Sequence, residues 1–295
     1  MQASPITKLF LDGREFLVKR DDLIDPYLAG NKYRKLYKLL KTPKESLLSV
    51  ISYGGTQSNA MLALAALCQK KGWQFVYYTK PVSQFLKEHK EGNYADALSL
   101  GMEHRELEEN LYREFIASLC LDTGADTFVV HQGGADEGAQ EGVEVLAEEI
   151  LHADIKVDAI VTPSGTGTTA LFLAKALPMY KIYTTPSIGS VEYLQEQMSA
   201  LATIPPNLTI LQPKKKYHFA KPYREFLEIQ QRLEDAGVCF DLLYAPLMWL
   251  TLLEQCRDEK ILYVHSGGVS GNTSMLKRYE KKFGKRGEAE ASPKV

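Results

Sequence analysis

The polar and apolar positions along this chain follow two different patterns. Residues 6–20 read ITKLFLDGREFLVKR, two alternating runs on either side of Asp12-Gly13. Asp-Gly between alternating runs is a strong two-residue turn signal, so we predict a β-hairpin here. From residue 47 onward, short apolar runs alternate with longer segments whose apolar residues have helical spacing. This second pattern predicts repeated strand–helix units.

Repeated strand–helix units predict parallel sheets that helices cover on both faces. The predicted strands cover residues 47–53, 74–79, 102–107, 126–131, 157–163, 181–186 and 260–268. The predicted helices cover residues 57–71, 82–100, 109–120, 137–151, 168–177 and 270–283, and the region 190–256 is expected to be mostly helical with a break near 203–211. The fold class is therefore α/β, with two open, mostly parallel twisted sheets. We assign residues 1–42 and 131–283 to a large domain and 43–130 to a small one, and we expect the charged tail 284–295 to be disordered.

Composition narrows the class of protein without naming a function. Of 295 residues, 45% are apolar and 24% are charged, with a net charge of -2, which is ordinary for a globular protein and gives no field for nucleic acid or an anionic membrane. The longest apolar runs are too short to span a bilayer. Four scattered cysteines lack the spacing of a metal site, so we expect a reduced, cytoplasmic protein without a structural metal.

Three small-polar segments follow predicted strands and open helices, where open parallel sheets bind ligands. They are SYGGTQSNA at 52–60, TPSGTGTTA at 162–170 and HSGGVSGNT at 265–273. The second is the best phosphate candidate, because its glycines allow close approach and its threonine hydroxyls stand at a helix N-terminus. It lacks the lysine of a Walker loop. An ordinary capped turn remains an equal alternative. In the first segment, Gln57, Ser58 and Asn59 could bind a carboxylate, although a plain helix cap explains them somewhat better.

Lys32 follows a Gly30-Asn31 turn at the start of a lysine-rich helix. We expect Asn31 to cap this helix, which would put Lys32 at the first helical position. A cation there opposes the helix dipole, so a neutral amine is the least costly state. Lys35 and Lys38 are expected on an exposed face.

Six motifs in one order resemble a known family. AGNKYRKLYKLL resembles the Gly-Asn-Lys-x-Arg-Lys-Leu motif of the 1-aminocyclopropane-1-carboxylate (ACC) deaminases and D-cysteine desulfhydrases. The segments GGTQSNA, HQGGADEGAQEG, SGTGTTA, DLLYAPLMW and YVHSGG resemble further motifs of that family. Together they span roughly residues 15–270, and the set is specific where no single member is.

The resemblance implies a pyridoxal-5'-phosphate (PLP) enzyme of fold type II, the tryptophan synthase β-like fold, acting on a small amino acid and commonly forming homodimers. It implies that Lys32 is the Schiff-base lysine and Tyr244 a catalytic tyrosine, and that Ser58 meets the substrate carboxylate. It further implies that the phosphate is held by Gly165, Thr166, Gly167 and Thr168, the phenolic oxygen by Asn59, and the pyridine nitrogen by Ser266.

The chain departs from the deaminase pattern near Tyr244. The deaminases continue Tyr-Glu-Gly-Lys, whereas here Ala245, Pro246 and Leu247 follow, and Ala60 replaces a polar residue after Ser-Asn. We therefore expect α,β-elimination on a substrate such as D-cysteine, giving pyruvate and ammonia. The alternatives are ACC deaminase itself, a PLP-binding protein without turnover, and a nucleotide-binding α/β protein.

The remaining features have structural interpretations. We expect His131 and His265 to bond backbone groups at strand ends, and Trp73 and Trp249 to lie in the core. Residues 213–226 are expected to form a solvated basic connection.

Overall fold

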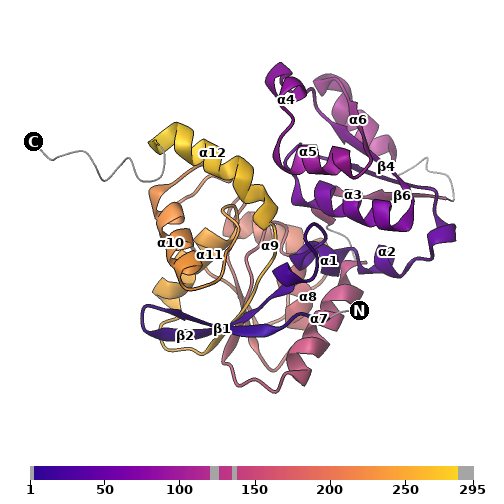
Figure 1. The fold of residues 1–295 in the computed structure, drawn as a ribbon. Helices are drawn as coiled ribbons and strands as arrows, with labels where there is room; N and C mark the ends of the chain where they lie inside the picture. Colours follow the sequence, from indigo (N-terminus) through magenta and orange to yellow (C-terminus); the bar gives the residue numbers. More distant parts are fainter. Residues whose placement is uncertain (1–2, 120–125, 135–137, 285–295) are drawn as a thin grey trace, which may run out of the picture.

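The chain folds around two separate sheets (Figure 1). A computed structural model describes residues 3–119, 126–134 and 138–284. The large sheet has the strand order β1-β2-β10-β7-β8-β9, and the small sheet has the order β5-β4-β3-β6. The strands are β1 (Ile6–Leu11), β2 (Arg14–Lys19), β3 (Ser49–Tyr53), β4 (Gln74–Thr79), β5 (Met102–Glu106), β6 (Thr127–Val130), β7 (Ala159–Val161), β8 (Lys181–Thr184), β9 (Leu208–Ile210) and β10 (Ile261–Val264).

Both sheets are open and mostly parallel, which confirms the predicted fold class. The hairpin is also confirmed, because β1 and β2 pair antiparallel with Leu11 opposite Arg14. Every other pairing in the two sheets is parallel. The predicted break within 190–256 holds a strand, β9, which pairs with β8 at the edge of the large sheet. The pattern missed β9 because three residues are too few to show a period.

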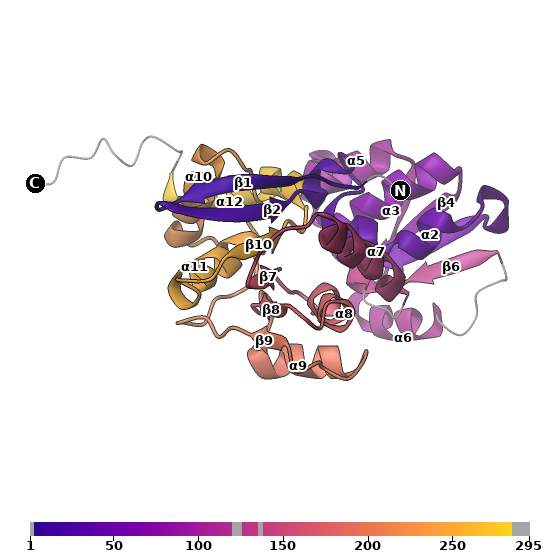
Figure 2. The ribbon, with the colours of Figure 1, turned by 90° about the horizontal axis from the view of Figure 1, so that it is seen from below.

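Helices pack on the sheets and connect their strands (Figure 2). They are α1 (Gly30–Lys35), α2 (Tyr37–Lys41), α3 (Asn59–Lys71), α4 (Gln84–Glu88), α5 (Gly92–Ser99), α6 (Glu109–Leu119), α7 (Ala139–His152), α8 (Thr168–Ala176), α9 (Val191–Ser199), α10 (Arg224–Asp235), α11 (Ala245–Gln255) and α12 (Asn272–Phe283). Short 3-10 helices are η1 (Asp21–Leu23), η2 (Lys44–Ser46), η3 (Gln132–Gly134) and η4 (Val269–Gly271). No helix in the described ranges is long and apolar enough to cross a membrane.

Each sheet has its own apolar core. Under the small sheet the central helix α3 is buried without interruption from Ala60 to Cys68, as its Ala/Leu-rich sequence requires. Trp249 lies in the core of the large sheet against Phe16, and Trp73 packs under the small sheet, as predicted. The predicted domain boundaries stay a prediction, and the tail from residue 285 lies outside the described residues.

Helix α1 lies where the two halves of the molecule meet (Figure 1). It packs on α7 from the large half and on α3 from the small half. Its residues therefore face the loops at the carboxyl ends of both sheets, which is the edge where open parallel sheets bind ligands.

Candidate functional site

The start of α1 is pressed against the loop that follows β10. Gly30 has a φ of +59°, and a Cβ added there would lie 2.0 Å from the Ser266 carbonyl oxygen. The backbone N–H of Asn31 donates to that same oxygen at 3.1 Å. Only glycine fits this contact, which explains why the sequence places Gly30 here.

The expected position of Lys32 in the helix was wrong. Ala29, not Asn31, is the N-cap residue, and no side chain caps the helix. Lys32 is consequently the third helical residue, because the contact between Gly30 and Ser266 starts the helix earlier than the polar pattern indicated.

The Lys32 side chain is half-buried. Its Nζ donates to Asn31 Oδ1 at 2.9 Å, and within the described ranges no carboxylate forms an ion pair with it. Burial lowers the pKa of Lys32 to about 8, and the nearby charge of Asp241 partly opposes this shift. The expected tendency toward a neutral amine therefore agrees in direction with the structure, and burial, more than the helix dipole, is its cause.

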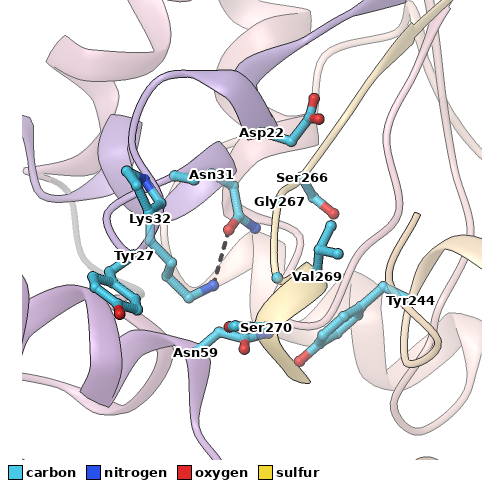
Figure 3. Close-up of a pocket in the computed structure, with 13 residues that line it drawn as sticks. Asp22, Tyr27, Asn31, Lys32, Asn59, Tyr244, Ser266, Gly267, Val269 and Ser270 are labelled. Atoms are coloured by element: carbon cyan, nitrogen blue, oxygen red, sulfur yellow. Dashed lines mark hydrogen bonds between the residues drawn. The ribbon is translucent and has the colours of Figure 1, made fainter. Parts of the chain in front are cut away.

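Asn59 and Tyr244 face the Lys32 amine from two other segments (Figure 3). The Oδ1 atom of Asn59 accepts a hydrogen bond from Asn93 Nδ2 at 2.7 Å, so the Nδ2 hydrogens are what Asn59 offers to the pocket. A Cβ on Gly268 would come within 2.6 Å of that Nδ2, so a glycine is needed here. Burial raises the pKa of the Tyr244 hydroxyl, which therefore keeps its proton.

Asp241 is a buried acid that our sequence analysis missed. Its carboxylate is 1% exposed, and its Oδ1 accepts from the backbone N–H of Leu243 at 3.0 Å and of Tyr244 at 2.6 Å. Burial raises its pKa to about 6, against the effect of these donors and of Lys32. Its Oδ2 is buried with no hydrogen-bond partner among the described residues. An aspartate that bonds the backbone N–H groups two and three residues on forms an Asx turn, and aspartate is a common residue in such turns, which is the signal that could have revealed it.

The turn from Gly165 to Thr169 opens α8, as the sequence predicted. The hydroxyls of Thr166 and Thr168 lie 2.9 Å apart, and the Thr169 hydroxyl is buried without a partner among the described residues. The Lys35 amine approaches Thr166 Oγ1 and the Gly133 carbonyl, each at 3.3 Å. The expectation that Lys35 is exposed was wrong, since it is 7% exposed and turns into this site, whereas Lys38 is exposed as predicted.

Ser58 is the N-cap residue of α3. Its hydroxyl oxygen accepts from the N–H of Ala60 at 3.2 Å and of Met61 at 3.3 Å. The cap interpretation is therefore confirmed. Ser58 also lines the cavity described next.

One cavity of about 730 Å³ brings all the predicted site residues together. Its lining includes Lys32, Ser58, Asn59, Gly165, Thr166, Gly167, Thr168, Tyr244 and Ser266. Phe219 and Ala220 also line it, so part of the 213–226 segment covers the cavity and does not merely connect β9 to α10. A smaller space of about 50 Å³ adjoins Lys32 on the side of Asp22 and Tyr27.

The two histidines at strand ends behave differently. His265 is buried and its Nε2 lies 3.0 Å from the Cys239 carbonyl oxygen, a backbone contact as expected. His131 lies at the surface of the large cavity, with its Nδ1 3.1 Å from the Tyr53 hydroxyl. We had expected a backbone contact for His131, and the sequence alone gave no sign of this tyrosine partner.

These residues fit an aldehyde cofactor that carries a phosphate. The orphaned Thr169 hydroxyl, the N–H groups that open α8 and the Lys35 cation form a cradle for an anion. An amine of lowered pKa, Lys32, lines the same cavity as this cradle. The Asn59 amide offers a donor beside that amine.

Comparison with known proteins points the same way. Residues 4–200 match the family model described as pyridoxal-phosphate dependent enzyme. A Pyrococcus horikoshii protein with the provisional name 1-aminocyclopropane-1-carboxylate deaminase is 26% identical over 290 residues, covering 88% of this chain and 86% of its own. The D-cysteine desulfhydrase of Serratia proteamaculans is 26% identical over 309 residues, covering 90% of this chain and 92% of its own.

Solved structures share the fold. The crystal structure of an ACC deaminase homologue superposes with a TM-score of 0.69 at 24% identity, covering 94% of each chain. A threonine deaminase superposes with a TM-score of 0.66 at 15% identity, covering 90% of this chain and 92% of its own.

Proposed function

The chain belongs to the pyridoxal-phosphate dependent enzymes, and from this premise we propose that it catalyses α,β-elimination on a small amino acid, with D-cysteine as the favoured substrate. The products would be pyruvate, ammonia and hydrogen sulfide. The observation that carries the proposal is the Lys32 amine, of pKa about 8, lining one cavity with the phosphate cradle, Asn59 and Tyr244.

In this proposal the cofactor is held by residues from three segments. Lys32 would join its aldehyde, and Asn59 would donate to its phenolic oxygen through the Nδ2 group that Asn93 leaves available. The turn formed by Gly165, Thr166, Gly167 and Thr168 would hold the phosphate, with Lys35 as a counter-charge. Ser266 would be the partner of the pyridine nitrogen.

When bound, pyridoxal-5'-phosphate supplies an electron sink for charge that develops at the substrate α-carbon. The residues of this chain do the rest. Ser58 at the start of α3 binds the substrate carboxylate, which fixes the α-carbon near Lys32. The Lys32 amine, once released, takes the α-proton, a task suited to a base whose pKa is close to neutral. Tyr244 keeps its proton and orients the substrate by hydrogen bonding.

Two departures in the sequence support elimination over ring opening of ACC. Ala245 follows the tyrosine, so no carboxylate stands at that position to keep the pyridine nitrogen protonated. Ser266 is a neutral partner, which weakens the electron sink. Elimination of a leaving group from the β-carbon tolerates a weaker sink, because the leaving group itself carries electrons away.

ACC deaminase is the second candidate. The relatives from Pyrococcus horikoshii and Thermotoga maritima both carry that name provisionally, at 26% and 25% identity. The activity would yield 2-oxobutanoate and ammonia from ACC.

A keto-acid assay separates these candidates. Purified protein is given pyridoxal-5'-phosphate and then D-cysteine, L-cysteine or ACC in separate reactions. We expect pyruvate and sulfide from D-cysteine, with Lys32→Ala as the inactive control. Release of 2-oxobutanoate from ACC without pyruvate from cysteine would favour the second candidate. A cofactor absorbance band without any keto acid would contradict both and favour a binding protein without turnover.

A further inference from the structure

Tyr53 and His131 stand side by side at the carboxyl edge of the small sheet. Strands β3 and β6 are parallel neighbours with Ser52 opposite Val130, so Tyr53 and His131 are the next pair in register. The Tyr53 hydroxyl lies 3.1 Å from His131 Nδ1, and the two rings meet edge to face with centroids 6.4 Å apart. The sheet register thus sets this pair where two cavity loops begin.

Both side chains line the large cavity that holds Lys32 and Ser58. Tyr53 immediately precedes the 54–58 loop, whose Ser58 we assign to the substrate carboxylate. His131 immediately precedes Gln132 and Gly133, which also line the cavity. Of the described residues in this lining, His131 carries the only imidazole. None of the roles assigned above uses either residue.

We propose that His131 donates the proton to the leaving group on the substrate β-carbon, with Tyr53 as its positioning residue. This inference rests on the proposed elimination function. The bond from the β-carbon to sulfur or oxygen breaks, and its electron pair goes to that heteroatom. The heteroatom takes the Nε2 proton of the imidazolium and leaves as hydrogen sulfide or water. The imidazole then regains a proton from solvent.

The Tyr53 contact fits this step. When the imidazole is charged, its Nδ1–H donates to the Tyr53 hydroxyl oxygen, so Nε2–H is the proton that can be transferred. Tyr53 thereby fixes the ring orientation, as second partners of catalytic imidazoles commonly do.

The other proton donors in the cavity are less suitable. Burial makes the Tyr244 hydroxyl a weaker acid than an ordinary tyrosine. Lys32 is assigned to the α-proton, and Lys35 is held beside Thr166 in the phosphate cradle. Imidazoles titrate closest to neutral pH among side chains, which is where general acids work best.

Two amino acids with different leaving groups test the role. Serine loses hydroxide, which requires a proton, whereas β-chloroalanine loses chloride, which does not. In His131→Gln we expect pyruvate release from serine to fall on the order of 100-fold, and release from β-chloroalanine to stay within about threefold of wild type. The enantiomer used is the one that the wild-type holoenzyme processes faster.

Further variants tie the result to geometry. Tyr53→Phe should show the same pattern, with a smaller loss on serine and none on β-chloroalanine. His152→Gln, which changes an exposed histidine on α7 outside the cavity lining, should leave both rates unchanged. A structural role for His131 would lower both rates by the same factor. The ratio of the serine rate to the β-chloroalanine rate therefore distinguishes a proton donor from a structural residue.

Equal losses on serine and β-chloroalanine in His131→Gln would overturn the role of His131 while leaving the proposed function intact. If the wild-type holoenzyme releases keto acid from none of serine, β-chloroalanine and D-cysteine, the proposed function and this role both fail.

Discussion

Lys32 and Arg34 lie two residues apart on the same short helix, yet their surroundings shift the pKa values of the two side chains in opposite directions. Arg34 is 0% exposed and makes two hydrogen bonds to Asp21, both at 2.8 Å, and two to Glu149, at 2.7 and 2.8 Å. Burial alone would lower the pKa of Arg34, but these hydrogen bonds raise it above its ordinary value. Lys32 has an amide as its hydrogen-bond partner, and burial lowers its pKa to about 8.

The two side chains therefore have different roles: Arg34 anchors α1, and Lys32 can react. Lys19 joins the Arg34 cluster through a 2.6 Å contact with Glu149, so two cations balance two carboxylates and tie α1 to β2, η1 and α7. A charge so well compensated holds the helix in place and cannot be given up. The amine on the opposite side of α1 is left with few compensating groups, so it can lose its proton.

The largest effect expected is on chemistry at Lys32. Lys32→Ala should remove the visible absorbance of the lysine-bound cofactor and lower keto-acid release by at least about a thousandfold, as loss of a covalent catalyst does. Absorbance spectra and a pyruvate assay measure both. Lys38→Ala on α2, an exposed lysine, is the matched control and should change neither. An unchanged band in Lys32→Ala would contradict the assignment of the reactive amine.

Loss of a carboxylate from the Arg34 cluster should affect the stability of the fold more than the catalytic activity. Glu149→Gln leaves Arg34 and Lys19 with one carboxylate fewer in a buried site. We expect unfolding free energy to fall by about 3–5 kcal/mol, the usual cost of an uncompensated buried charge. Denaturant unfolding followed by circular dichroism measures it.

Glu141→Gln on the same helix gives the comparison for Glu149. Glu141 pairs with Lys41 at 2.8 Å, but both side chains are exposed. Its loss should leave the unfolding midpoint nearly unchanged, because solvent screens such pairs. Equal destabilisation by the two substitutions would show that burial of the cluster is not what matters.

The charge near Lys32 can be changed without changing its surroundings. Asp241→Asn keeps an oxygen for the N–H groups of Leu243 and Tyr244 but removes the negative charge that raises the pKa of Lys32. The pKa of Lys32 should therefore fall below about 8, and cofactor attachment, which needs the neutral amine, should reach its maximal rate at lower pH.

The pH window of the Asp241 effect follows from its own pKa. Because burial raises the pKa of Asp241 to about 6, wild type and Asp241→Asn should differ above pH 6 and converge below it, where the wild-type acid is also neutral. The rate at which the absorbance band grows between pH 5 and 9 measures both features. A midpoint that does not move would mean that the Asp241 charge does not reach the amine.

The contrast on α1 also shows what the sequence could and could not tell. The strand–helix alternation predicted the two sheets, because apolar periodicity records burial directly. The order of the six motifs led us to expect Lys32, Asn59 and the 165–168 turn at one site, and all of them line one cavity. Nothing local, however, showed that Lys35 turns inward toward Thr166 while Lys38 turns out to solvent. Which lysine is buried depends on contacts with residues about 100 positions away, and the same is true of the pair of Tyr53 and His131.

The smallest effect expected comes from the amide that holds the amine. Asn31→Ala removes the Oδ1 acceptor of Lys32 Nζ while keeping the backbone bond to Ser266. One hydrogen bond to a charged group is worth roughly 1.5–3 kcal/mol at most, and water in the open cavity will replace part of it. The pH midpoint of cofactor attachment should again move down, but less than in Asp241→Asn. Because an amide does not titrate, the difference in attachment rate from wild type should persist below pH 6, where the Asp241 effect vanishes. If the rate difference caused by Asn31→Ala also disappears below pH 6, Asn31 acts only by relaying the charge of Asp241. Lys32 then owes its lowered pKa to burial alone.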